Sequence, residues 1–189
     1  MLKEIIKETT DAVAAAVSGV DDILGAVTDT VKHQVINVLK GTGEISGAGV
    51  EAVASVASGA IKGAGDVGAS LTGVVTNTMS GVVKGANQVG GDVISAVRGG
   101  VEGIVTAVAE TGGDVGGAAV SAVQGAIKAV GDIGANTADA AKAAVGGALD
   151  ATTTLGGSAA STVRDALLSA AALPKELVES VIKGRDNKK

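Results

Sequence analysis

Small and hydrophobic residues recur along the chain with a 22-residue period. Seven windows of this length align without a gap, and they cover residues 15–168. Self-similarity at a fixed period is typical of repeat architectures. The sequence therefore predicts three parts: an N-terminal capping helix segment (1–14), seven repeats (15–168), and a C-terminal capping helix with a solvated tail (169–189). The windows begin at Ala15, Asn37, Gly59, Gly81, Gly103, Gly125 and Gly147.

Each window divides into two related 11-residue halves. A half-window of this length makes three helical turns, so the pattern keeps its phase along a helix. On a helical wheel, Val, Ile, Ala and Gly form one broad apolar arc, while the fourth and eighth positions face away from it. This face is expected to contact another surface through Ile61, Val67, Val83, Val89, Val105, Ile127, Ile133, Leu149 and Leu155.

Charged residues on the opposite face support the helical interpretation. Lysine precedes an acidic residue by four positions at Lys40/Glu44, Lys62/Asp66 and Lys128/Asp132. Each such pair contributes about 0.3 kcal/mol on a helix surface. The fold class is therefore all-α, with long amphipathic helices folded into a hairpin or bundle. A β-solenoid is disfavoured by the alanine content.

A short-helix solenoid, which turns once in every half-window, is the alternative shape, and glycine pairs support it. A glycine stop followed by Asp or Ser is how one helix ends and the next begins. Three such stops occur, at Gly90-Gly91-Asp92, Gly112-Gly113-Asp114 and Gly156-Gly157-Ser158. Near the C-terminus, Pro174 is expected to open a last short helix and Gly184 to close it.

The composition limits the kind of core that the chain can build. It has no aromatic residue and no cysteine, with 30 glycines, and its apolar share of 46% is mainly Ala and Val. Each glycine in a helix interior costs on the order of 0.8–1 kcal/mol relative to alanine. An isolated helix of this sequence is therefore expected to be largely unfolded until contact with a partner orders it.

Glycines spaced four positions apart offer one form of contact. Such spacing lets two helix backbones approach closely. A self-association face of this kind is predicted, although chance also yields such pairs in a glycine-rich chain. The close-packing candidates are Gly81/Gly85, Gly99/Gly103 and Gly113/Gly117.

Charge argues against several classes of partner. The net charge of −5 disfavours nucleic acid, because phosphate binding needs an excess of Lys and Arg. The longest uncharged stretch, residues 67–83, is short and contains polar residues, so no transmembrane span is expected. The absence of a signal-like N-terminus and of cysteine favours a cytoplasmic location, with peripheral attachment to a lipid or granule surface as an option.

The sequence offers no residues for enzymatic chemistry, a metal site or a cofactor. His33 is the sole histidine and is expected on the surface. A GxGxxG match from Gly63 to Gly68 lies inside a repeat without a preceding strand, which disfavours a dinucleotide site. Thr152, Thr153 and Thr154 raise ice binding as a minor alternative, but threonine does not recur at one repeat position.

The stretches from Gly59 to Gly100 and AVSAVQGAIKAVGDIG resemble the 11-residue repeats of perilipins and synucleins. This resemblance covers roughly residues 15–168, and it implies a helix that folds on lipid droplets or vesicles. The chain departs from those families in its acidity and its higher Ala and Gly content. The leading hypothesis is a non-enzymatic coat or structural protein on an apolar surface (lipid droplet, granule or vesicle). The alternative is a self-assembling helical scaffold, tube or filament without lipid.

Overall fold

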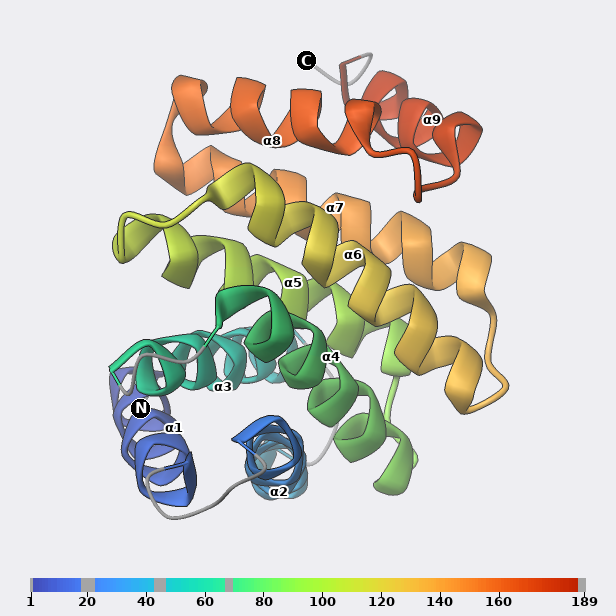
Figure 1. Ribbon diagram of the computed structural model, residues 1–189. Coiled ribbons are helices and arrows are strands. Elements are labelled where there is room, and N and C mark those ends of the chain that lie inside the picture. The colour runs from blue at the N-terminus through green and yellow to red at the C-terminus, as the bar shows by residue number, and fades with distance from the viewer. Residues whose placement is uncertain (1, 18–22, 43–46, 67–69, 187–189) are drawn as a thin grey trace.

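The chain folds into a stack of α-helices (Figure 1). The computed structural model describes residues 2–17, 23–42, 47–66 and 70–186, and every regular element within these ranges is a helix. The all-α prediction is confirmed. In chain order the helices are α1 (Leu2–Val17), α2 (Ile23–Thr42), α3 (Gly47–Asp66), α4 (Leu71–Gln88), α5 (Val93–Glu110), α6 (Val115–Asp132), α7 (Thr137–Leu155), α8 (Gly157–Ser169) and α9 (Lys175–Asp186).

The helices form two layers. Each helix packs on its neighbours in sequence and also on the helix two places along the chain. The odd-numbered helices α1, α3, α5 and α7 therefore make one layer, and the even-numbered helices α2, α4, α6 and α8 make the other (Figure 1). This arrangement is an α-solenoid, in which each unit buries its apolar face against the next.

One helix and one turn correspond to each full repeat. The helices α4, α5, α6 and α7 begin one repeat length apart, at Leu71, Val93, Val115 and Thr137, and each takes the second half of one window and the first half of the next. A single continuous helix through the repeats is therefore not formed, and the chain does not turn in every half-window. The alternative shape, a short-helix solenoid, is closer to the observed fold, but the chain turns once per full window and not once per half-window.

The turns explain this spacing. Gly90, Gly112, Gly134 and Gly156 have positive φ angles between 68° and 97°, which only glycine adopts without strain. At the first of them, the amide of the next residue bonds back to the end of the preceding helix, from Gly91 N to Ala86 O at 2.9 Å. This pattern is the Schellman motif, which satisfies the last carbonyls of a helix.

Side chains then cap the following helix. Asp92 accepts hydrogen bonds from the backbone amides of Ile94 and Ser95, and Asn136 caps α7 in the same way. The predicted stops at Gly90 and Gly112 are thus confirmed. At the third stop, α8 begins at Gly157, so Ser158 lies inside the first turn and is not its cap.

Within each layer, glycine brings the helices into backbone contact. A Cβ atom on Gly59 or Gly99 would stand 2.6 Å from the carbonyl oxygen of Ile6 and 2.5 Å from that of Val50, respectively. The Gly59–Ile6 contact spans 53 residues of sequence and the Gly99–Val50 contact spans 49. Hydrogen bonds repeat the offset of 49, from Thr10 to Gly59 O and from Thr28 to Asn77 O. Backbone contact therefore holds each helix in register with the helix two places earlier. At Gly103 and Gly147, a Cβ would overlap the carbonyl of the residue at that same offset, in Ala54 and Arg98.

The core consists mainly of valine and alanine, because such close approach leaves little room for larger side chains. Its largest fully buried side chains are Ile61, Met79, Ile104 and Leu167. Among the described helices, none combines the length and apolar character needed to cross a bilayer.

The C-terminal helix and the ion pairs differ in detail from the predictions. Helix α9 begins directly after Pro174, as expected, but it continues past Gly184. The Lys128–Asp132 pair forms at 3.1 Å. Lys62 forms an ion pair with Glu110 of α5 at 2.7 Å. The predicted pairs Lys40/Glu44 and Lys62/Asp66 each include an acidic side chain outside the described ones.

Candidate functional surface

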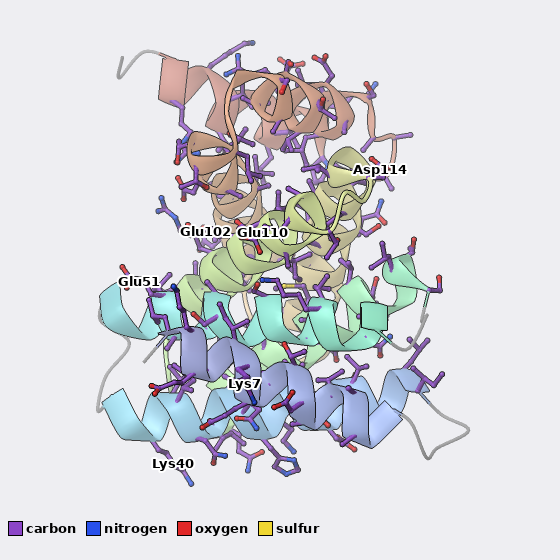
Figure 2. All side chains as sticks on the ribbon, turned by 90° about the vertical axis from the view of Figure 1, so that its left-hand side faces the viewer. Lys7, Lys40, Glu51, Glu102, Glu110 and Asp114 are labelled. Atoms are coloured by element: carbon purple, nitrogen blue, oxygen red, sulfur yellow. The ribbon has the colours of Figure 1, made fainter. Side chains whose placement is uncertain are left out.

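A shallow groove crosses the outer face of the odd-numbered layer. It has a volume of about 240 Å³ and takes residues from four helices, α1, α3, α5 and α7. Figure 2 shows Glu102 and Glu110 on this face, with Glu51 nearby. Its lining combines carboxylates, hydroxyls and small apolar groups, from Ile6, Ala54, Ser55, Ser58, Glu102, Gly103, Thr106, Glu110 and Thr154.

Glu102 is the perturbed acid of this groove. Burial raises the pKa of its carboxyl above the usual value, and Glu51 adds to this shift by repulsion. Arg98 and Arg185 act in the opposite direction by attraction. Because burial is the largest of these causes, the ionised form of Glu102 is held at some cost to the folded state.

Glu110 lines the groove and forms an ion pair with the neighbouring helix. Its carboxylate forms an ion pair with Lys62 of α3 at 2.7 Å, and the lysine side chain is 30% exposed. The pair ties α3 to α5 within one layer. Partial exposure limits its contribution to about 1 kcal/mol or less.

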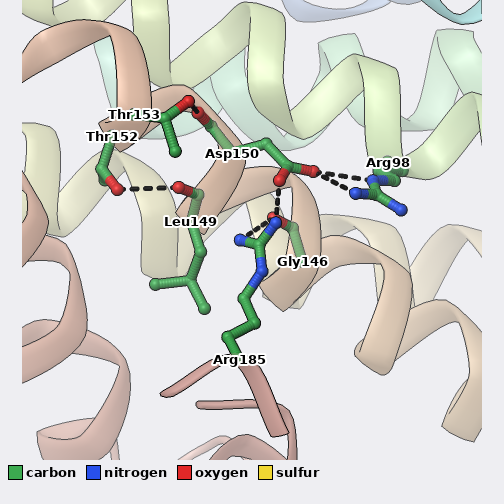
Figure 3. Close-up of polar contacts among 7 residues, drawn as sticks. All are labelled: Arg98, Gly146, Leu149, Asp150, Thr152, Thr153 and Arg185. Carbon is green, nitrogen blue, oxygen red and sulfur yellow. Dashed lines mark hydrogen bonds and ion pairs between the residues drawn. The ribbon is translucent and has the colours of Figure 1, made fainter. Parts of the chain in front are cut away.

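A second polar cluster joins three odd-numbered helices (Figure 3). Asp150 of α7 is the centre, with a side chain only 19% exposed. Arg98 of α5 reaches one carboxylate oxygen at 2.6 and 2.7 Å, and Arg185 of α9 bonds the other. Arg185 also donates to the carbonyl of Gly146 at 3.2 Å. Burial and the nearby Arg98 lower the pKa of Arg185, although its guanidinium stays charged.

The residues predicted as an apolar contact face lie between helices of the same chain. Ile61, Val83, Val105 and Leu149 are buried. Four others, Val89, Ile127, Ile133 and Leu155, are partly buried against the core, and Val67 lies outside the described residues. In the folded chain these positions therefore contact neighbouring helices, and an external surface could reach the four buried ones only if the stack opened.

The predicted glycine pairs divide into two groups. Gly81, Gly85, Gly99 and Gly103 face the backbone of the helix two places earlier in the chain. The other pair makes no such approach. Gly113 lies in a turn, where its nearest neighbour is Val108, and Gly117 lies against the Asp114 carboxylate that caps its own helix. The spacing of this pair matched the pattern by chance.

The remaining sequence candidates have ordinary structural settings. His33 is exposed on α2, as expected. Gly63 and Gly65 lie within α3, while the end of that GxGxxG match falls outside the described residues. The hydroxyls of Thr152, Thr153 and Thr154 donate to carbonyls one turn earlier in α7, at 2.6–2.8 Å, and Thr152 is buried. No cluster of three metal-ligating side chains occurs among the described residues.

The sequence alone does not predict the Arg98–Asp150–Arg185 cluster, although the repeat contains one signal of it. Asp150 stands at the fourth window position, where Lys40, Lys62, Lys84 and Lys128 stand in other windows. A reversal of charge at a repeated position indicates a local partner of opposite sign. The partners themselves, 52 and 35 residues away, could not be identified without the fold.

These features define an all-helical repeat protein with a polar groove and a three-helix ionic cluster. Carboxylates and hydroxyls of this kind can bind polar or cationic groups by hydrogen bonding and charge. No protein-family model matches the sequence, and a search of curated proteins found no significant match.

Proposed function

We propose that this chain is a non-enzymatic helical scaffold whose repeats are ordered by packing on one another without lipid. The observation that carries the proposal is the close approach of glycines to the backbone of the helix two places earlier. A glycine-rich helix of this sequence is expected to need contact with a partner to stay folded. In this fold, neighbouring helices of the same chain supply that contact.

The scaffold would present its odd-numbered layer to a partner. The apolar stripe of each repeat is buried in the core, so most polar side chains lie on the outer surface of the layers. The groove beside Glu102 gives that layer a concave polar surface drawn from four helices. We propose a cytoplasmic setting and a structural role, in which a rigid surface holds other components in place.

A coat on a lipid droplet, granule or vesicle is the second proposal, supported by the resemblance to perilipin and synuclein repeats. One structural observation favours it. The residues that pack between helices, such as Ile61 and Val105, are the same apolar stripe that would lie on lipid. A stack that opened on an oil surface would therefore exchange contacts between helices for contacts with lipid.

Circular dichroism and light scattering separate these proposals. The scaffold predicts a fully helical monomer in dilute buffer, with no gain in helicity on adding a phosphatidylcholine-stabilised triolein emulsion. A poorly helical sample that gains helicity with the emulsion would favour the coat. Large helical particles in the absence of lipid would instead indicate a filament or tube.

A glycine substitution sharpens this test because its sign differs between the two proposals. A Cβ on Gly63 would stand 2.5 Å from the carbonyl oxygen of Thr10, so Gly63→Ala should lower the melting temperature of the scaffold. On lipid, the same change should raise helicity, since alanine favours helix and no second backbone is near. Gly65→Ala is the matched control, because a Cβ there has nothing within 4 Å.

A further inference from the structure

Helix α9 is built differently from the helices of the stack. It has 12 residues, whereas α3 to α7 have 18–20. Its polar contacts to α7 span 35 and 39 residues of sequence, compared with 49 and 52 for hydrogen bonds inside the odd-numbered layer. Among the described helices it packs only on α7 and α8. Helix α9 is therefore a cap laid across the end of the stack, and it does not continue the repeat.

Few apolar side chains hold this cap. Leu173 in the preceding turn is 4% exposed, and Val178 and Ile182 of α9 are 1% and 5% exposed. The opposite side of α9 carries exposed charges, including the Lys183–Glu179 pair at 3.0 Å. Three buried aliphatic side chains contribute far less than the continuous Val and Ala core beneath them.

Among the described side chains, the polar attachment of α9 to the stack is one bridge at its far end. Arg185 donates to the Gly146 carbonyl and pairs with one oxygen of Asp150, while Arg98 holds the other oxygen (Figure 3). Asp150 is thus fixed by α5 whether or not Arg185 is present. The groups that bind the Arg185 guanidinium, Asp150 and the Gly146 carbonyl, lie in α7 of the stack. Arg185 is the residue that α9 contributes to this bridge.

We infer that the α9 cap opens as one unit while helices α1 to α8 stay folded. Segments with few buried apolar contacts open at a lower free energy than the core of the same protein. Within the described helices, opening breaks the contacts of α9 to α7 and α8, and it leaves the Arg98–Asp150 pair intact. Opening exposes the aliphatic faces of α7 and α8 that Val178 and Ile182 cover. The α9 cap therefore controls whether this end of the stack is exposed.

Hydrogen exchange with mass spectrometry on the full chain tests the inference. In the wild-type protein, amides of α9 should exchange at least about tenfold faster than those of α5. Arg185→Gln should accelerate exchange in α9 by a further factor of about ten, the size expected for losing one hydrogen bond between charged groups. The exchange rates in α5 should not change.

Lys183→Gln is the matched control. It removes the same charge from the same helix, but the Lys183 side chain is 73% exposed and, among the described residues, pairs with Glu179 of α9 itself. This variant should leave exchange in α9 within about twofold of the wild type. Equal protection of α9 and α5 in the wild type would overturn the inference. So would equal effects of Arg185→Gln and Lys183→Gln, or acceleration of α5 as large as that of α9.

Discussion

The first helix of each layer and the helices stacked on it carry different residues at the same repeat position. The first window position is Ala15 in α1 and Asn37 in α2, and both are exposed. In α3 to α7 the same position is glycine, and it is buried each time, at Gly59, Gly81, Gly103, Gly125 and Gly147. Helices α1 and α2 have no earlier helix in their layer to approach.

This difference indicates why glycine occupies the first window position in α3 to α7. A helix forms equally well or better with alanine at that position, so helix formation does not require glycine there. It is present where a second backbone lies within contact distance and absent where none does. One helical turn earlier, α1 and α2 carry Asp11 and His33, both exposed. Polar residues at these positions end the stack, as terminal repeats must.

The largest expected effect comes from filling one contact glycine. In Gly147→Ala the new Cβ would overlap the Arg98 carbonyl, so we expect a loss of about 2–3 kcal/mol in the free energy of unfolding. Gly146→Ala is the matched control next to it, where a Cβ meets nothing within 4 Å. That variant should gain about 0.5–1 kcal/mol from helix propensity. Urea denaturation measures both, and equal effects would show that Gly147 makes no special contact.

A turn glycine should have the next largest effect. Gly112 has a φ of +73°, so Gly112→Ala should cost about 1–2 kcal/mol of stability. Gly41→Ala, at an open helical position, should be neutral or stabilising. Thermal melts of the two variants check this. An unchanged midpoint for Gly112→Ala would mean that the turn between repeats does not depend on a left-handed residue.

The helix caps should contribute about 1 kcal/mol each. Asp92 accepts two backbone amides of α5, whereas Ser70 at the equivalent position makes no side-chain cap bond. Asp92→Ala should therefore destabilise the protein more than Ser70→Ala does. The Ser95 hydroxyl and the two amides lower the pKa of Asp92, so its contribution is present above its unfolded value and is lost as pH falls through the lowered one. The difference between wild type and Asp92→Ala in urea melts should shrink over that range of pH.

Two neighbouring threonines in α1 should respond in opposite directions. The Thr9 hydroxyl is buried with no hydrogen-bond partner among the described residues, and other repeats place Val31, Val53 and Val75 at its position. Thr9→Val should therefore stabilise the chain by about 1 kcal/mol. Thr10→Val should destabilise it by a similar amount, because the Thr10 hydroxyl donates to the carbonyls of Ile6 and Gly59. Calorimetry measures the change in melting temperature of both variants. Changes of the same sign would contradict this account.

The smallest effect concerns Glu102. Its pKa is raised mainly by burial, so the ionised form carries a penalty that disappears as pH falls through the raised value. Glu102→Gln should increase stability at neutral pH by less than about 1 kcal/mol, because the side chain is only partly buried. Gln124 already occupies the equivalent position one repeat later. A variant less stable than wild type at pH 7 would show that attraction to Arg98 and Arg185 dominates.

The repeat and the helical class could be predicted from the sequence because both depend on periodicity. The buried stripe, including Ile61 and Val105, was also identifiable, since one apolar arc must be covered in any helical fold. What covers that arc was not predictable. An apolar stripe of Val and Ala has the same pattern whether it lies on lipid, on a second chain or on its own neighbours.

Glycine obscured the length of the helices. It occurs at contact positions such as Gly103 and at turn positions such as Gly112, and these roles look alike in one sequence. The positive φ angle distinguishes them, and that angle appears only in the folded chain. For the same reason the Arg98–Asp150–Arg185 cluster was not predictable, because its members come together only once the layers have stacked.

A cysteine cross-link tests most directly the claim that the repeats order one another at a fixed register. The chain has no cysteine, and the Thr28 hydroxyl lies 3.0 Å from the side-chain oxygen of Asn77, 49 residues away. Thr28→Cys with Asn77→Cys should form an intramolecular disulfide in dilute, lipid-free buffer, while Asp29→Cys with Asn77→Cys should not. Bonds formed only between molecules, or only after lipid is added, would contradict the account.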